Sequence, residues 1–170
     1  MVRDWQRRLR RAIVRNDHHS AVAGAVAGVG GAIAIGIMEL FSVVASYPLA
    51  VIPFATSIVL VMGSPNAEPA QPRALIGGHL VSALVGLAVL KLTGPHAWAA
   101  AVAVGLSILA MYVTGTFHPP AGINPLLIVS GGLPWTFLLA PVLAGALLLT
   151  VFSYVWHVVV RRQRWPQRWL

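Results

Sequence analysis

Residues 20–45 read SAVAGAVAGVGGAIAIGIMELFSVVA, an almost unbroken apolar run whose one acid is Glu39. A helix needs about 20 apolar residues to cross a hydrocarbon core about 30 Å thick. Three further stretches have comparable length and composition: 74–90, 97–117 and 135–160. The sequence therefore predicts an all-α integral membrane protein with four transmembrane helices.

The overall composition agrees with a chain embedded in lipid. Of the 170 residues, 58% are hydrophobic and 9% are charged, whereas soluble domains carry about 25% charged residues. Ten of the twelve basic residues lie before residue 16 or after residue 160. We therefore expect a single domain over 1–170, with a membrane region at 20–160 between basic cytoplasmic tails at 1–19 and 161–170.

Two shorter apolar segments, 48–63 and 119–133, contain prolines and are too short to cross a bilayer easily. Non-helical backbone is tolerated at membrane depth only where protein or a water-filled cavity surrounds it. We expect both segments to be re-entrant half-helices that enter from the non-cytoplasmic side.

The order of span, short segment and span occurs twice along the chain. Residues 53–60 can be aligned with 120–127, so that polar Ser57 and Asn124 fall at equivalent positions. The pattern indicates a possible internal repeat. Because each unit would contain two crossings, the repeat is expected to be parallel, about an axis along the membrane normal.

The arginine-rich tails predict the orientation, because positive loops stay in the cytoplasm. With four crossings both termini and the 91–96 connection are cytoplasmic, while Glu68 and Arg73 lie outside. We expect a multi-pass protein of a bacterial inner (plasma) membrane.

Small residues recur every four positions in two of the predicted spans. The first span has Gly24, Gly28, Ala32 and Gly36, and the second has Gly78, Ser82 and Gly86. Small residues let helices approach closely in lipid. The two spans offer more close-packing faces than a bundle of four helices needs. The sequence therefore predicts that the protein forms a homo-oligomer.

Glu39 continues the small-residue face of the first span and is therefore expected to point inward. An ionisable residue inside a membrane is a functional candidate. Glu39 is either a structural acid bonded to a neighbouring helix or a gating, proton-linked group.

Several classes of function are excluded. The chain has no cysteine, which removes disulfides, thiolate catalysis and cysteine-bound metals. Its histidines lack a metal-ligand spacing, and no serine, histidine and acid form a recognisable catalytic set. Its basic residues do not alternate with aromatics as nucleic-acid binding would require. We expect no enzyme activity, metal, cofactor or nucleic-acid partner.

The two proline-led segments predict a site for a small anion. Proline is favoured at the first helical position, so one helix would start after Pro53 and the other at Pro120. Their free amides, at Phe54–Ser57 and Ala121–Asn124, would point into the membrane together with two helix dipoles, which favour anions. The alternative is a loop that only plugs the outer surface.

The candidate binding residues are those at the two helix starts together with nearby polar side chains. They are Phe54, Ala55, Thr56, Ser57, His79, His118, Pro119, Pro120, Ala121, Gly122 and Asn124. We favour a functional role for His118, because the prolines that follow it restrict the backbone. Arg73 is either an ordinary interfacial arginine or attracts anions to the site.

Three segments resemble, in the same order, the HPP family of small integral membrane proteins. They are 53–57 (PFATS), 71–79 (QPRALIGGH) and 116–125 (TFHPPAGINP), and the family takes its name from His118-Pro119-Pro120. The resemblance covers about residues 19–160. It implies four spans and nitrite transport, the activity described for members in chloroplast envelopes and cyanobacteria. The chain departs from common family sequence at 55–57 and at 123–125.

The expected function is therefore transport of a small monovalent anion, nitrite first, across a lipid bilayer and between the two half-helix starts. Two other classes stay open. The domain could be a non-transporting membrane scaffold or sensor, or a channel for a small neutral solute. A water-accessible cavity at the helix starts would favour transport, and a leucine-filled interior would favour the scaffold.

Overall fold

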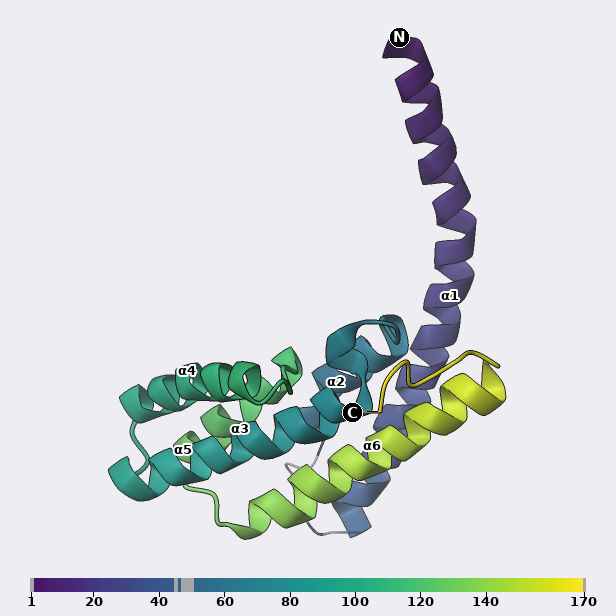
Figure 1. Ribbon diagram of the computed structural model, residues 1–170. Coiled ribbons are helices and arrows are strands. Elements are labelled where there is room, and N and C mark those ends of the chain that lie inside the picture. The colour runs from purple at the N-terminus through teal and green to yellow at the C-terminus, as the bar shows by residue number, and fades with distance from the viewer. Residues whose placement is uncertain (1, 45, 47–50, 170) are drawn as a thin grey trace.

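The computed structural model describes the backbone of residues 2–44, 46 and 51–169, and side chains from residue 21 onward within those ranges. In these residues the chain forms six α-helices and no strand (Figure 1). The helices are α1 (Val2–Val44), α2 (Ile52–Gly63), α3 (Pro72–Thr93), α4 (Ala97–Val113), α5 (Ile123–Gly131) and α6 (Ala144–Tyr154). The all-α class is confirmed.

Short helical turns extend several of these helices. The 3₁₀ turns η1 (Glu68–Ala70) and η2 (Pro119–Gly122) precede α3 and α5, and the π-helical turns η3 (Leu138–Leu143) and η4 (Val155–Val160) flank α6. Pro141 lies inside η3. A wider turn is one way for a helix to continue past a residue without an N–H group.

Three helical segments are long and apolar enough to cross a membrane. They are Ala21–Val44, Pro72–Thr93 and Leu138–Val160. The remaining predicted span, 97–117, corresponds to α4, which is apolar but has 17 residues. The protein is therefore a multi-pass membrane protein in which the helix of the third predicted span is shorter than expected.

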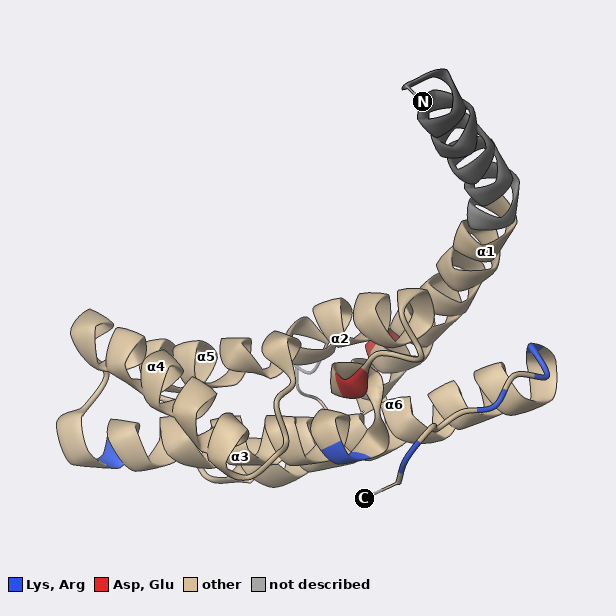
Figure 2. Cartoon of the chain, turned by 45° about the horizontal axis from the view of Figure 1, so that its top comes forward, with Lys and Arg blue, Asp and Glu red and all other residues tan. Residues whose placement is uncertain are grey.

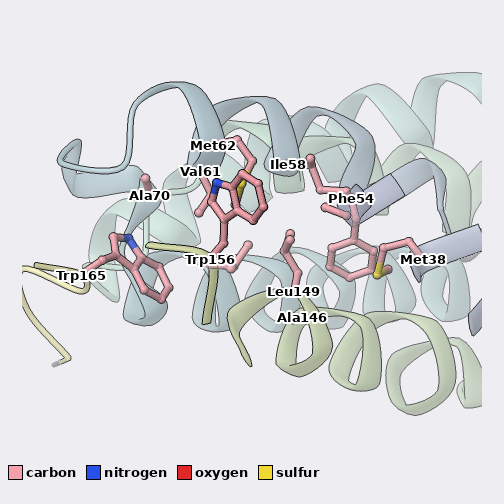
Figure 3. Close-up of a cluster of buried hydrophobic side chains, with 12 residues drawn as sticks. Met38, Phe54, Ile58, Val61, Met62, Ala70, Ala146, Leu149, Trp156 and Trp165 are labelled. Atoms are coloured by element: carbon pink, nitrogen blue, oxygen red, sulfur yellow. The ribbon is translucent and has the colours of Figure 1, made fainter. Parts of the chain in front are cut away.

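The helices pack in two groups, and α3 of one group also contacts the other through Leu75 (Figure 1). In one group, α1, α2 and α6 enclose an apolar cluster that includes Met38, Phe54 and Leu149 (Figure 3). In the other, α3, α4 and α5 pack together through Val89, Ala99 and Val129, among others. A further cluster joins α3 to η3. Both short helices thus lie against long ones.

The packing partners show the direction in which each short helix runs. Asn124 bonds Ser82, and Ile128 lies beside Gly86, so α5 is parallel to α3. The short 64–71 connection joins α2 to α3, and the two helices meet again where Ser57 bonds His79. Consequently α2 is antiparallel to α3, and α2 and α5 run in opposite directions.

The opposite directions of α2 and α5 contradict a parallel repeat, which would give them the same direction. That part of the predicted fold is wrong. Short helices that run in opposite directions are instead typical of inverted repeats. In this arrangement α2 packs on α6 of the second unit, where Phe54 meets Gly145, and α5 packs on α3 of the first.

The contacts of α2 and α5 also differ from those of two re-entrant segments that enter from one face, because such segments would run in the same direction. The first turn of α2 packs against Gly145, inside the long α6 segment, and its last turn leads into the 64–71 connection. The helix α5 begins beside Ser82 and continues along α3 towards its end. Each short helix therefore extends from the interior of the protein towards one end of the long helices. Residues 47–50, where the first predicted segment begins, lie outside the described residues.

The C-terminal tail lies against the connection between α2 and α3. The backbone N–H of Gln167 donates to Oε1 of Gln71 at 2.8 Å, and its side-chain amide donates to Asn66 at 3.0 Å. Trp165 is buried and belongs to the same apolar cluster as Ala70 of the connection. Tail and connection therefore share one face of the molecule.

This contact corrects the predicted orientation. Glu68 and Arg73, in or next to that connection, lie on the same face as the C-terminal tail, not on the opposite one. The 22 residues of α3 separate them from the 91–96 connection, because a helix rises about 1.5 Å per residue. The 91–96 connection is thus on the face opposite the tail. Figure 2 shows basic positions at both ends of α3 and along the tail.

The predicted close packing of the two small-residue faces holds for α3 but not for α1 within the single chain. In α3 the close packing is confirmed, because a Cβ on Gly78 or Gly86 would clash with the chain around His118 or Pro125. In α1 the residues Gly24, Gly28, Ala32 and Gly36 are exposed, and a Cβ on any of these glycines would have no atom within 4 Å. Glu39 is exposed as well, so its predicted inward position is wrong within the single chain.

Candidate binding site

Four polar side chains from separate segments meet in the interior of the protein. They are Ser57 from α2, His79 from α3, His118 from the turn before η2 and Asn124 from α5, and each has 0% of its surface exposed. All four are among the residues predicted from the sequence. We call them the polar cluster.

His79 is the centre of the polar cluster. Its Nε2 lies 2.9 Å from Oγ of Ser57, and its Nδ1 lies 3.0 Å from Nδ2 of Asn124. The two residues that the sequence alignment made equivalent therefore bind opposite sides of one imidazole ring. Asn124 also donates to the His79 carbonyl at 3.1 Å and to Oγ of Ser82 at 2.9 Å.

His118 connects the cluster to η1. Its Nε2 lies 2.9 Å from Oγ of Ser57, and its Nδ1 lies 2.6 Å from the carbonyl oxygen of Pro69. A carbonyl only accepts hydrogen bonds, so Nδ1 of His118 carries a proton. The rings of His79 and His118 are 5.1 Å apart, which puts two titratable groups side by side.

An aromatic ring closes one side of the cluster. Phe54 is fully buried, and its ring centroid lies 4.5 Å from that of His79. The same ring belongs to the apolar cluster of Figure 3. Hydrogen bonds in such apolar surroundings are stronger than in water, and unpaired polar groups there are costly.

Gly78 allows the segment before η2 to reach α3. A Cβ at this position would lie 2.6 Å from Cβ of His118 and 2.8 Å from the carbonyl oxygen of Thr116. The absence of a side chain thus lets His118 approach His79. Sequence reasoning assigned Gly78 only to helix packing, although its place directly before His79 was a usable signal.

The expected free amides at the helix starts are largely occupied. The amides of Phe54 and Ala55 both donate to the carbonyl of Val51, because α2 begins before Pro53. The amide of Ala121 donates to the carbonyl of His118. The predicted donor set of backbone amides is therefore wrong at these positions, and side chains provide the polar groups of the site.

The remaining predicted residues surround the cluster without joining its hydrogen bonds. Ala121 is buried, Ala55, Pro120 and Gly122 are half-buried, and Pro119 is exposed. Thr56 is exposed, so the structure does not bring it together with the cluster. Ser82 and the carbonyl of Pro69 do join the network, and nothing in the sequence indicates the role of this carbonyl.

Arg73 lies at the rim of a polar surface pocket that reaches η1. Its guanidinium donates to the carbonyl of Thr114 at 3.1 Å, and it shares one pocket with Glu68 and Arg168. The adjoining pocket, of about 420 Å³, includes Pro69 in its lining. The carbonyl that binds His118 thus belongs to a residue that solvent can approach.

One buried polar atom of the cluster has no partner. Oδ1 of Asn124 makes no hydrogen bond with any residue that the structure describes. Buried acceptors are nearly always paired with protein or water. Oδ1 is therefore a position where a ligand or water with an N–H or O–H group would bind.

The fold and the polar cluster define a multi-pass membrane protein with a buried polar site between two oppositely directed short helices. Residues 16–166 match the family model described as HPP, transmembrane region. The chain therefore belongs to the HPP family, as the sequence resemblance indicated.

Two curated relatives are transmembrane proteins of Dictyostelium discoideum. The chain is 37% identical to one and 34% identical to the other, over 124 residues in each case, which is 68% of this chain. It spans less than half of each relative, 44% and 40% of their lengths. No solved structure matches the chain.

Proposed function

We propose that this protein transports a small monovalent anion across the membrane, nitrite first, and that the polar cluster is its binding site. The observation that carries the proposal is the position of the cluster, inside an otherwise apolar helical assembly and at the junction of α2 and α5. Secondary transporters commonly bind substrates at interrupted helices of inverted repeats. Polar and ionisable groups at such depth are costly and usually functional.

The cluster contains donors that could replace part of the hydration of a small anion. They are the hydroxyl of Ser57, the imidazole N–H groups of His79 and His118, and the amide of Asn124. The cluster itself contains no lysine or arginine. Selectivity would then depend on size and donor geometry, since no permanent cation fixes the charge.

The polar pocket beside Pro69 is the proposed route to the cluster. Arg73 and Arg168 lie in its vicinity, and positive groups at an opening raise the local concentration of anions. Glu68 lies in the same pockets, so the net attraction is modest and weakens with salt.

A second candidate is a channel for a small neutral solute. The unpaired Oδ1 of Asn124 is an acceptor, which suits the N–H group of a small amide better than it suits an anion. The scaffold reading has less support, because a partner-binding domain does not need four buried polar side chains joined in its interior.

We further propose that α2 and α5 complete two broken crossings, and that the chain works as a homo-oligomer through the exposed small-residue face of α1. Its membrane would be a bacterial inner membrane. The apolar start of the α1 span lies beside Val160 and Arg161 at the end of η4, which supports two tails on one face, proposed as the cytoplasmic one.

Solute flux into liposomes tests the proposal. Purified protein would be reconstituted, and uptake of nitrite, nitrate, formate, chloride and urea would be compared with uptake by protein-free liposomes. We expect nitrite to enter fastest. Fast urea uptake with no anion uptake would select the neutral-solute channel, and background rates for every solute would reject transport.

A further inference from the structure

The hydrogen bonds of the polar cluster have only one consistent direction when both histidines are neutral. The Pro69 carbonyl requires the proton of His118 on Nδ1, so Nε2 of His118 is an acceptor and takes the hydroxyl proton of Ser57. Ser57 then accepts from Nε2–H of His79. Nδ1 of His79 is left as an acceptor, and the amide of Asn124 donates to it. Each of these four bonds has one proton and one acceptor, and the two protons of the Asn124 amide are shared among Nδ1 and the carbonyl of His79 and Oγ of Ser82.

When both histidines are neutral, every proton in the row of hydrogen bonds from Asn124 to the Pro69 carbonyl is already donated to a protein acceptor. None is therefore free to bind an anion. Binding an anion therefore requires a change in the network. A proton added at Nε2 of His118 would make that nitrogen a donor, and Ser57 would accept from both rings. The hydroxyl of Ser57 would then turn away from His118, towards the Pro53 carbonyl at 3.4 Å or towards a bound anion.

We propose that His118 takes up one proton with each anion that the cluster binds, so that anion and proton move together. This inference rests on the proposed transport function and specifies its coupling. A buried imidazolium without a counter-charge is costly, and so is a buried anion. Each stabilises the other, and by linkage each raises the affinity for the other equally. The pair carries no net charge.

His118 is the member of the cluster closest to a source of protons. Its partner Pro69 and its neighbour Phe117 both line the polar pocket of about 420 Å³. His79 is further inside, because Ser57 separates its Nε2 from that of His118. The proton therefore reaches His118 first, and the anion occupies the side of Ser57.

Among the described residues near His118, His79 is the one other titratable side chain that is buried. The elements packed against His118 contribute Glu68 from η1, Arg73 from α3 and Tyr112 from α4, all exposed, and exposed Lys91 lies at the far end of α3. Neither α2 nor α5 contains an ionisable residue. With rings 5.1 Å apart, charge on one histidine opposes charge on the other, which limits the cluster to one proton.

The test measures proton and nitrite movement together in the same liposomes. A trapped pH indicator would follow protons, and a potassium gradient with valinomycin would set the membrane potential. After subtraction of protein-free liposomes, we expect one proton to enter per nitrite, and a nitrite rate that rises with outside acidity but is unaffected by potential. Nitrite flux that follows the potential and carries no protons would overturn the coupling and leave anion transport standing. Absence of flux for every anion would instead reject the transport function on which the coupling rests.

Two single variants test whether His118 is the residue that takes up the proton. His118→Gln keeps a side chain that can hydrogen-bond but cannot take up a proton, so any remaining nitrite flux should lose its proton movement and become sensitive to potential. His157→Gln is the matched control, because His157 is also buried and also bonds a carbonyl, that of Val61, outside the cluster. Equal proton movement with nitrite in H118Q and wild type would exclude His118 as the proton site.

Discussion

At the scale of single residues, His79 organises the site because each of its ring nitrogens has a different partner. Loss of either partner leaves a buried nitrogen unpaired, and an unsatisfied buried polar group costs about 1–3 kcal/mol. The ring is held from the apolar side by Phe54. The cluster is therefore sensitive to small changes in backbone position, most of all where His118 approaches α3.

Gly78→Ala should destabilise the protein and separate His118 from His79. The new methyl group would overlap Cβ of His118 and the carbonyl of Thr116, and forced overpacking costs about 1–3 kcal/mol. Gly105→Ala in α4 is the control, since its Cβ would meet no atom within 4 Å and alanine favours a helix. Thermal unfolding in detergent should show a lower midpoint for G78A alone. Equal midpoints would contradict the close approach.

The sequence could identify Ser57, His79, His118 and Asn124 because polar groups are conspicuous in apolar, proline-led segments. It could not separate Thr56 from Ser57, since adjacent residues are about 100° apart on a helix and the buried side depends on the neighbouring helix. The carbonyl of Pro69 carries no sequence signal at all, because every residue has one.

At the scale of helices, the directions of α2 and α5 decide how the site is built. The two helices approach His79 from oppositely directed units, and each packs along a long helix of the other unit. Ser57 and Asn124 therefore bind opposite sides of the same ring. Two re-entrant segments entering from one face would not produce this opposed arrangement.

Cysteine labelling can test the corrected orientation, because the natural chain has no cysteine. Single cysteines would replace exposed Glu68, His96 and Arg168, and intact membranes would be treated with an impermeant reagent. Positions 68 and 168 should react from one side and position 96 from the other. Reaction of 68 and 168 from opposite sides would contradict the contact between tail and connection.

The sequence predicted where helices begin and end better than how they cross. Prolines lie in the first turns of α2 and α3, and Gly94 and Gly132 follow α3 and α5 with positive φ, as expected for helix starts and stops. The directions of α2 and α5 could not be predicted, because they depend on whether each short segment returns to the face of the protein from which it started. That is set by the packing of Phe54 on Gly145 and Ile128 on Gly86, contacts between residues far apart in the chain.

At the scale of the whole molecule, α1 presents an unoccupied surface. Its four-residue repeat of glycine and alanine is exposed, together with Glu39. A carboxylate on a lipid-facing surface is unfavourable, whereas a second copy of the chain would cover both features. The prediction of a homo-oligomer from the glycine pattern remains a prediction, and the exposed face of α1 gives it a specific interface.

Gly28→Leu should convert the multimer into single chains without unfolding them. A larger side chain at this position fits the isolated chain, since a Cβ there meets no atom within 4 Å, but it would keep two α1 helices apart. Native mass spectrometry in mild detergent measures the outcome. A multimer that persists in G28L would place the interface elsewhere.

The central claim, that an anion passes through the polar cluster, is tested most directly by nitrite flux in two matched variants of the half-helices. Asn124→Leu removes the donor to His79, while Thr56→Leu changes an exposed position of α2. Both proteins would be checked for intact helical structure and compared with wild type in liposomes. The account predicts that N124L falls to the rate of protein-free liposomes and that T56L transports like wild type. Equal transport by N124L and wild type would contradict it.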